Sequence, residues 1–114
     1  MHEKNTMVIA NVMCGELDVA LVRLGKVTSS QEAINGLEKQ GLRPGNLQNL
    51  LTFRDKCPAE YMKHAVVAFG DIRRGPYDCR NIPCLGEEKS KPGLSLHWFD
   101  TEWGNKHWFM GIKK

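Results

Sequence analysis

Short apolar runs predict two strands at the start of the chain. Residues 6–13 and 17–24 are rich in Val, Ile and Leu, and the Cys-Gly-Glu segment between them is typical of a short hairpin connection. In the second run both alternating sets of side chains are apolar, so both faces of that strand should be buried. We therefore expect an interior strand, with helices covering one face of its sheet.

The segment after this hairpin changes to a helical spacing. Ser29 and Glu32 have the S-x-x-E spacing in which each side chain can satisfy a free amide at the start of a helix. Apolar residues then recur every three to four positions, and Gly41 can adopt the left-handed conformation that commonly ends a helix. The first helix should therefore begin near Ser30 and stop by Gln40.

A second helix is predicted after a Leu-Arg-Pro-Gly connection. Asn46 is suited to cap its first turn, and Pro58 bounds its far end. The apolar stripe of this helix consists of Leu47, Leu50, Leu51 and Phe53.

The pattern returns to strands after the second helix. Residues 65–69 are a buried strand by composition, whereas Pro76 and Pro83 would confine a short strand over residues 77–85 to a sheet edge or to irregular structure. The charged residues 86–93 are typical of a solvated turn.

All three tryptophans lie in the final stretch, which predicts a C-terminal hairpin. Its first strand alternates Leu94, Leu96 and Trp98 with more polar residues, and its return strand carries Trp108 on the same apolar face. Residues 100–105 would form the connection. Trp98 and Trp108 are therefore expected in the core, while Trp103 falls in the turn, where nothing requires burial.

Together these elements predict an α+β fold in a single domain, residues 1–114. Two helices should pack on one face of a mostly antiparallel sheet of five or six strands. The length of 114 residues is that of one domain, and the content of 41% hydrophobic and 25% charged residues is that of a folded protein.

Three segments of the chain resemble a family of small, uncharacterised bacterial proteins. They are the Gly-Leu-Arg-Pro segment at 41–44 with its following leucines, the Val-Val-Ala-Phe-Gly run at 66–70, and the L-x-L-x-W-F-D segment at 94–100 with a closing F-x-G-x-K-K. The likeness covers residues 17–114. It implies the order strand, helix, "GLRP" turn, helix, strand and C-terminal hairpin, and it implies no particular activity.

Charge and cysteine content narrow the function classes. Sixteen basic and 13 acidic residues leave a net charge of +3, which tolerates anionic partners and excludes a nucleic-acid mimic. No apolar run approaches the roughly 20 residues that span a bilayer, so we expect a cytoplasmic protein. In that reducing compartment the four cysteines should remain thiols without disulfides.

Metal and catalytic chemistry have little support in the sequence. Cys79 and Cys84 lie five positions apart, which is wide for a zinc knuckle, and no second matching pair exists. Whether Cys57, Cys79 and Cys84 bind a metal stays open. No phosphate loop, nucleophile elbow or paired-histidine motif is present, so we expect no catalytic residue, no cofactor and no enzyme.

Two groups of residues are candidates for a contact surface. Arg73, Arg74, Tyr77 and Arg80 are the densest basic and aromatic cluster, in a Gly- and Pro-containing loop that could grip phosphate or carboxylate groups. A second candidate is a rim that could stack a base or anchor a protein, formed by His97, Phe99, Trp103 and His107.

The leading hypothesis is a small non-enzymatic binding protein that occupies the surface of a protein partner, as an inhibitor or adaptor of bacterial or phage origin. A phage-borne protein directed against a bacterial defence system is one form of this hypothesis. One alternative is sequestration of a small anionic ligand such as a nucleotide, with the arginines on phosphate and Trp103 or Phe99 on the base. Another is nucleic-acid binding through the helix pair, whose neighbourhood is basic. A homodimer could form through the predicted edge strand.

Overall fold

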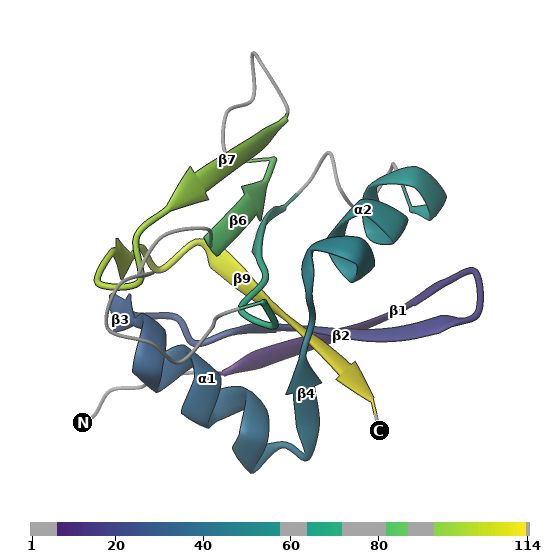
Figure 1. The fold of residues 1–114 in the computed structure, drawn as a ribbon. Coiled ribbons are helices and arrows are strands. Elements are labelled where there is room, and N and C mark those ends of the chain that lie inside the picture. The colour runs from purple at the N-terminus through teal and green to yellow at the C-terminus, as the bar shows by residue number, and fades with distance from the viewer. Residues whose placement is uncertain (1–6, 58–63, 72–81, 87–92, 114) are drawn as a thin grey trace.

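The computed structural model describes residues 7–57, 64–71, 82–86 and 93–113. It confirms an α+β fold with two helices and a mostly antiparallel sheet (Figure 1). The sheet has seven strands in the order β1-β2-β9-β5-β6-β7, with β4 pairing on β9 beside this path. A separate two-stranded ribbon joins β3 to β8. None of the described helices is both long and apolar enough to cross a membrane.

The predicted N-terminal hairpin is confirmed. β1 (Val8–Cys14) and β2 (Leu17–Arg23) pair antiparallel down to Cys14 opposite Leu17. Gly15 turns the chain with a φ of 66°, which glycine adopts without strain. β2 is interior as expected, because its other side pairs with β9.

The first helix also follows the prediction. α1 (Ser30–Lys39) begins after the short strand β3 (Thr28–Ser29). The Ser29 hydroxyl accepts from the Glu32 backbone N–H at 3.1 Å, and the Ser29 N–H donates to the Glu32 carboxylate at 3.0 Å. This is the predicted capping box. Gly41 then leaves the helix with a φ of 75°.

The capping box makes stability depend on pH. The backbone hydrogen bond from Ser29, and then the charge of Lys26 at 3.8 Å, hold the pKa of Glu32 below its ordinary value of 4.5. A lowered pKa means that the stabilisation is complete above the unfolded-state pKa and is lost as pH falls through the folded-state pKa. We therefore expect Glu32→Gln to reduce the loss of unfolding free energy that occurs as the pH falls through the ordinary glutamate pKa of 4.5 and below it, measured by urea unfolding at each pH.

Glu38→Gln is the matched control, because it removes the same charge from the far end of α1. It should keep the wild-type slope against pH. Equal slopes in wild type and Glu32→Gln would contradict the capping role of the carboxylate.

The second helix lies beyond a strand rather than a turn. β4 (Leu42–Pro44) pairs antiparallel with β9, and α2 (Leu47–Lys56) follows it. Asn46 caps α2 as predicted, through reciprocal hydrogen bonds of 2.8 and 2.9 Å with Asn49. The boundary residue Pro58 lies outside the described residues.

The two helices cover opposite faces of the sheet, so the prediction that both lie on one face is wrong. Alternate residues of β2, β5 and β9 divide into two apolar clusters, one on each face. α2 contributes Leu50 and Phe53 to one cluster, and α1 contributes Ala33 and Leu37 to the other. The error arose because residues 42–44 were predicted to be a turn between two helices on the same face. They form β4, which carries the chain from the α1 face of the sheet to the α2 face (Figure 1).

The predicted C-terminal hairpin is wrong as a pairing. β7 (Leu94–His97) pairs with β6 (Ile82–Leu85), whereas β9 (His107–Lys113) pairs with β2, β4 and β5 (Ala65–Val67). The intervening segment forms β8 (Glu102–Trp103), which pairs with β3. The alternating pattern identified both strands but carried no information about which strand each one joins.

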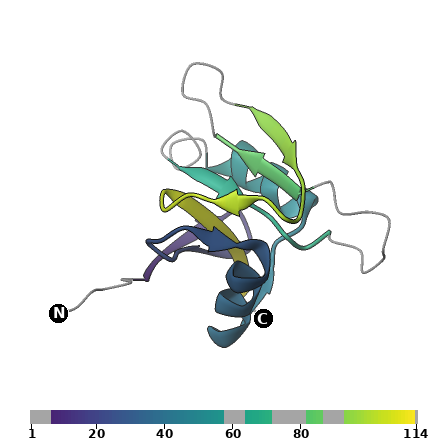
Figure 2. The same cartoon turned by 90° about the vertical axis from the view of Figure 1, so that its left-hand side faces the viewer.

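The predicted edge strand is interior where the structure describes it. β6 has β5 on one side and β7 on the other. Pro83 is tolerated there because its carbonyl still accepts from the Ala68 N–H at 3.1 Å, and the ladder with β5 ends at that point. Residues 77–81 lie outside the described residues. Among the described strands, β7 is therefore the edge of the sheet on this side, and β1 is the edge on the other (Figure 2).

Candidate functional site

The basic candidates lie outside the part of the chain that the structure describes. This applies to Arg73, Arg74, Tyr77 and Arg80, so their role as a contact surface stays a prediction. The four aromatic and imidazole candidates are described, and they are brought together around one side chain.

That side chain is Trp103, which is completely buried. The rings of His97 and His107 lie against it, with centroid distances of 5.2 and 5.3 Å and edge-on geometry. Phe69 meets it edge-on at 6.0 Å. The half-buried Phe99 packs against the same apolar cluster. The four predicted residues therefore do form one cluster, but Trp103 at its centre belongs to the hydrophobic core and not to an exposed rim.

The prediction that Trp103 is exposed in a turn is wrong, because β8 holds it over the start of α1. Trp103 lies opposite Thr28 in the β3–β8 ribbon, and its indole N–H donates to the Ser30 hydroxyl at 2.9 Å. The Ser30 hydroxyl donates in turn to the Phe99 carbonyl at 2.5 Å. A buried indole whose polar atom is satisfied in this way is a structural anchor and cannot stack a base.

The two histidines are tied to neighbouring strands and turns. His97 Nε2 lies 3.1 Å from the Ser95 hydroxyl, which is also 3.3 Å from the Cys84 carbonyl. His107 Nδ1 accepts from the Gly104 N–H at 3.1 Å. A serine beside a histidine can act as a nucleophile, with the histidine as its base. Here the Ser95 hydroxyl also donates to the Cys84 carbonyl across the β6–β7 pair. The contacts account for the orientation of both imidazoles.

One exposed apolar surface lies on the opposite face of β7. Leu94, Leu96 and Trp98 are 44%, 53% and 51% exposed, whereas Ser95 and His97 face the cluster around Trp103. The expectation that Trp98 belongs to the core is therefore wrong. Leu94 and Leu96 continue the sheet face that α2 covers, because Leu94 lies opposite the core residue Leu85, and Trp98 directly follows the strand. These three residues are called the β7 stripe below.

At Leu94 and Leu96 the backbone N–H and C=O groups of β7 also point away from β6, toward the open edge of the sheet. The Pro83 carbonyl accepts from the N–H of Ala68, which directly follows β5, so the backbone polar groups of residue 83 face away from β7. In an antiparallel pair such a position faces a residue whose own groups also point away. Leu96 lies opposite Pro83, and Leu94 has the same parity two residues earlier. The N–H and C=O groups of Leu94 and Leu96 therefore point to the open edge, where no described strand pairs with them.

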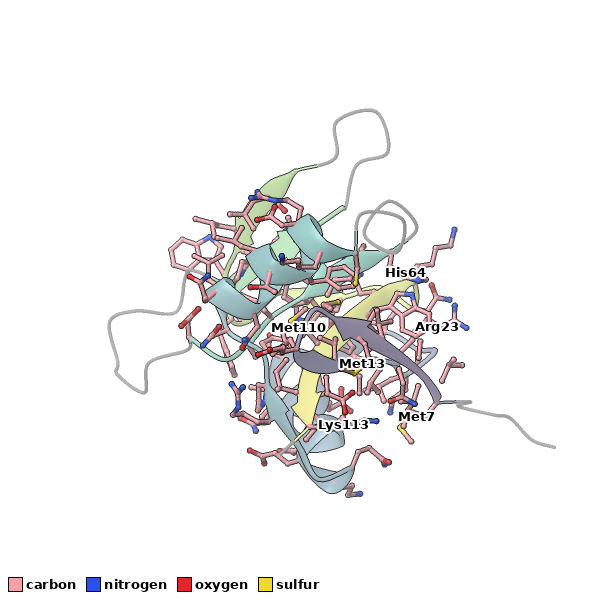
Figure 3. The ribbon with its side chains drawn as sticks, turned by 90° about the vertical axis from the view of Figure 1, so that its right-hand side faces the viewer. Met7, Met13, Arg23, His64, Met110 and Lys113 are labelled. Atoms are coloured by element: carbon pink, nitrogen blue, oxygen red, sulfur yellow. The ribbon has the colours of Figure 1, made fainter. Side chains whose placement is uncertain are left out.

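A second aromatic cluster surrounds Trp108 on the α2 face. The Arg23 guanidinium carbon lies 5.1 Å from the centre of the Trp108 ring, and the His64 ring centroid is 4.8 Å away. Figure 3 shows Arg23 and His64 side by side on this side of the molecule. A guanidinium over an indole face stabilises both groups, so the cluster explains how the apolar stem of Arg23 is held.

The described residues support neither a metal site nor nucleic-acid binding through a helix-turn-helix. Within residues 7–57, 64–71, 82–86 and 93–113, no three His, Cys, Asp or Glu side chains are close enough to hold a metal ion. Cys79 lies outside these ranges. The helices are separated by β4 and lie on opposite faces, so they do not form a helix-turn-helix.

Comparisons with protein families, with curated proteins and with solved structures found no match for this chain. The resemblance to the bacterial family with the "GLRP" segment therefore stays a prediction.

The β7 stripe could have been identified from the sequence as one face of a strand, because Leu94, Leu96 and Trp98 occupy alternate positions. The missing information was the long-range pairing that leaves this strand at the edge. The alternation of apolar and polar residues along a strand looks the same whether the apolar face packs against a helix or is exposed to solvent.

Proposed function

We propose that this protein binds a protein partner by accepting an extended segment of that partner as an additional strand on β7. The observation that carries the proposal is the coincidence of two features on one edge strand. The β7 stripe exposes three large apolar side chains, and the outward backbone groups of Leu94 and Leu96 are positioned for a further ladder. In strand addition, backbone hydrogen bonds supply affinity and alternate side chains supply specificity.

The chemistry of the partner segment follows from the two faces of β7. Side chains of an added strand that fall on the stripe face would lie beside Leu96 and Trp98, so apolar residues are favoured at those positions. Those on the other face would lie beside Ser95 and His97, where polar residues are acceptable. The expected partner segment therefore alternates apolar and polar residues. Trp98 is the anchor, because tryptophan is enriched among residues that dominate binding energies.

β1, at the opposite edge of the sheet, offers a less continuous surface. Ile9 and Met13 are 38% and 61% exposed there, but the polar Asn11 lies between them on the same face. No such polar residue interrupts the β7 stripe. The comparison favours β7, and it supplies a matched control on the other edge.

Such a mode of binding suits an inhibitor or adaptor. A protein that adds its edge to an extended segment occupies that segment and denies it to other partners. This role requires neither a catalytic group nor a cofactor, and its specificity comes from the order of side chains along a strand.

The experiment uses a library of displayed extended peptides, selected on the full-length chain, followed by affinity measurement of the enriched peptides by fluorescence anisotropy. Leu96→Pro should weaken binding about tenfold or more, because it removes an outward N–H and an apolar contact. It leaves the bonds between β6 and β7 intact, since the N–H of residue 96 does not serve them. Met13→Lys, on the opposite edge, should leave the affinity unchanged.

Amide hydrogen exchange tests the geometry directly. In the free chain the amides of Leu94 and Leu96 should exchange quickly and those of Ser95 and His97 slowly, and peptide binding should protect the first pair. Loss of binding in Met13→Lys, with Leu96→Pro unaffected, would place the partner on β1 and overturn the proposal. Protection of Leu94 and Leu96 that rises with protein concentration alone would identify a second copy of the chain as the occupant, which also overturns it.

A further inference from the structure

Two cysteines far apart in sequence meet where α2 ends against the N-terminal hairpin. The Cys14 and Cys57 sulfur atoms are 2.6 Å apart, although 43 positions separate the residues. A covalent S–S bond is about 2.05 Å long. Both are in the thiol form in this structure, with no disulfide between them. The approach of the two sulfurs is therefore close to the bonding distance before any bond exists.

The backbone on each side holds the pair in place. Cys14 is the last residue of β1 and lies opposite Leu17 in the hairpin ladder. Cys57 is the C-cap of α2, with its N–H bonded to the Phe53 carbonyl at 2.9 Å and its sulfur 3.4 Å from the Met13 carbonyl. The side chain of Lys56 lies over the turn at Gly15. The meeting of the thiols thus results from the docking of α2 on the hairpin and not from one mobile side chain.

Access differs between the two sulfurs. Cys57 is half-buried and can meet a small molecule, whereas Cys14 is buried in the core cluster of the α2 face. An oxidant from solution should therefore react first at Cys57, and Cys14 should complete the reaction from inside.

We propose that Cys14 and Cys57 form a redox-active dithiol that closes to an intramolecular disulfide by exchange with a small-molecule disulfide such as oxidised glutathione. The Cys57 sulfur attacks one glutathione sulfur, forms a mixed disulfide and releases one reduced glutathione. The Cys14 sulfur then attacks Cys57, and the second reduced glutathione leaves. The two protein thiols lose two electrons and two protons, which reduce one glutathione disulfide to two thiols.

The expected product is a covalent connection between the tip of the β1–β2 hairpin and the end of α2. Closing a loop of this length restricts the unfolded chain, so the oxidised form should melt about 10 °C above the reduced form. The prediction that all cysteines stay reduced without disulfides then applies only while the glutathione pool is reduced.

The test incubates the full-length chain with oxidised glutathione, followed by intact-mass measurement, peptide mapping without reduction, and thermal melting. The expected result is a mass lower by two hydrogens with no retained glutathione, a linked peptide pair containing Cys14 and Cys57, and the higher melting temperature. Dithiothreitol should reverse all three. Cys57→Ser should show neither the link nor the gain, and Cys79→Ser should show both.

Three results would overturn the proposal. One is a stable glutathione adduct on Cys57 with Cys14 still free. Another is a linked peptide pair that contains Cys79 or Cys84. The third is free thiols throughout. The map is made on the wild-type chain, so the outcome does not depend on whether a variant folds.

Discussion

Trp103→Ala should lower the free energy of unfolding by about 4 kcal/mol, within the range for deleting a fully buried aromatic side chain. Trp103 has no exposed surface, and it contacts both half-buried histidines as well as Phe69. Its loss would empty the junction of β8, β7 and α1. Equilibrium urea unfolding, followed by far-ultraviolet circular dichroism, measures the change.

The indole N–H can be tested apart from the bulk of the ring. Ser30→Ala leaves the Trp103 N–H and the Phe99 carbonyl without the hydroxyl that joins them, which should cost about 2 kcal/mol. Trp103→Phe removes the same hydrogen bond from the other side. The double variant should therefore lose less than the sum of the two single losses. Strict additivity would show that the hydrogen bond contributes nothing.

Gly70→Ala should destabilise the fold by about 3 kcal/mol, at the upper end of the usual cost of overpacking. An added Cβ at Gly70 would lie 2.7 Å from the backbone carbonyl of Gly45 and from the Pro44 carbonyl oxygen. The Gly70 N–H donates to that same Gly45 carbonyl. The end of β4 and the exit from β5 meet there, beside β9, and backbone atoms cannot rotate out of the way as a side chain can.

Gly36→Ala is the matched control for this prediction. It adds the same atom in the interior of α1, where the nearest neighbour of the new Cβ is a Leu24 methyl group at 3.6 Å. Because alanine favours helices over glycine, this variant should gain about 0.5 to 1 kcal/mol. Urea unfolding of both variants gives the comparison. A loss at Gly70 no larger than a few tenths of a kcal/mol would mean that the strand ends can separate cheaply.

Locally determined elements could be predicted from the sequence because their signals lie within a few residues. The Ser29 and Glu32 capping box fixed the start of α1, Gly41 its end, and Asn46 the start of α2. The first hairpin needed only two adjacent apolar runs and a glycine turn. In each case the interacting groups are neighbours along the chain, so spacing alone identifies them.

Long-range pairing could not be predicted, and the errors about the site follow from that. Joining β7 to β9 placed Trp98 in the core and Trp103 in a turn. In the structure β7 pairs with β6 and β8 pairs with β3, Trp98 is exposed and Trp103 is buried. The meeting of Cys14 with Cys57 depends likewise on how α2 docks. The spacing of the cysteines in the sequence does not indicate that these two are in contact.

The central position of β9 has a consequence for synthesis on the ribosome. β2, β4 and β5 all pair with this one strand, yet all three are translated before it. The first hairpin can close early, but the backbone edges of β2 and β5 that face β9 stay unpaired until residues 107–113 emerge from the exit tunnel. The nascent chain therefore passes through a stage that chaperones would recognise, and sheet assembly waits for its last strand.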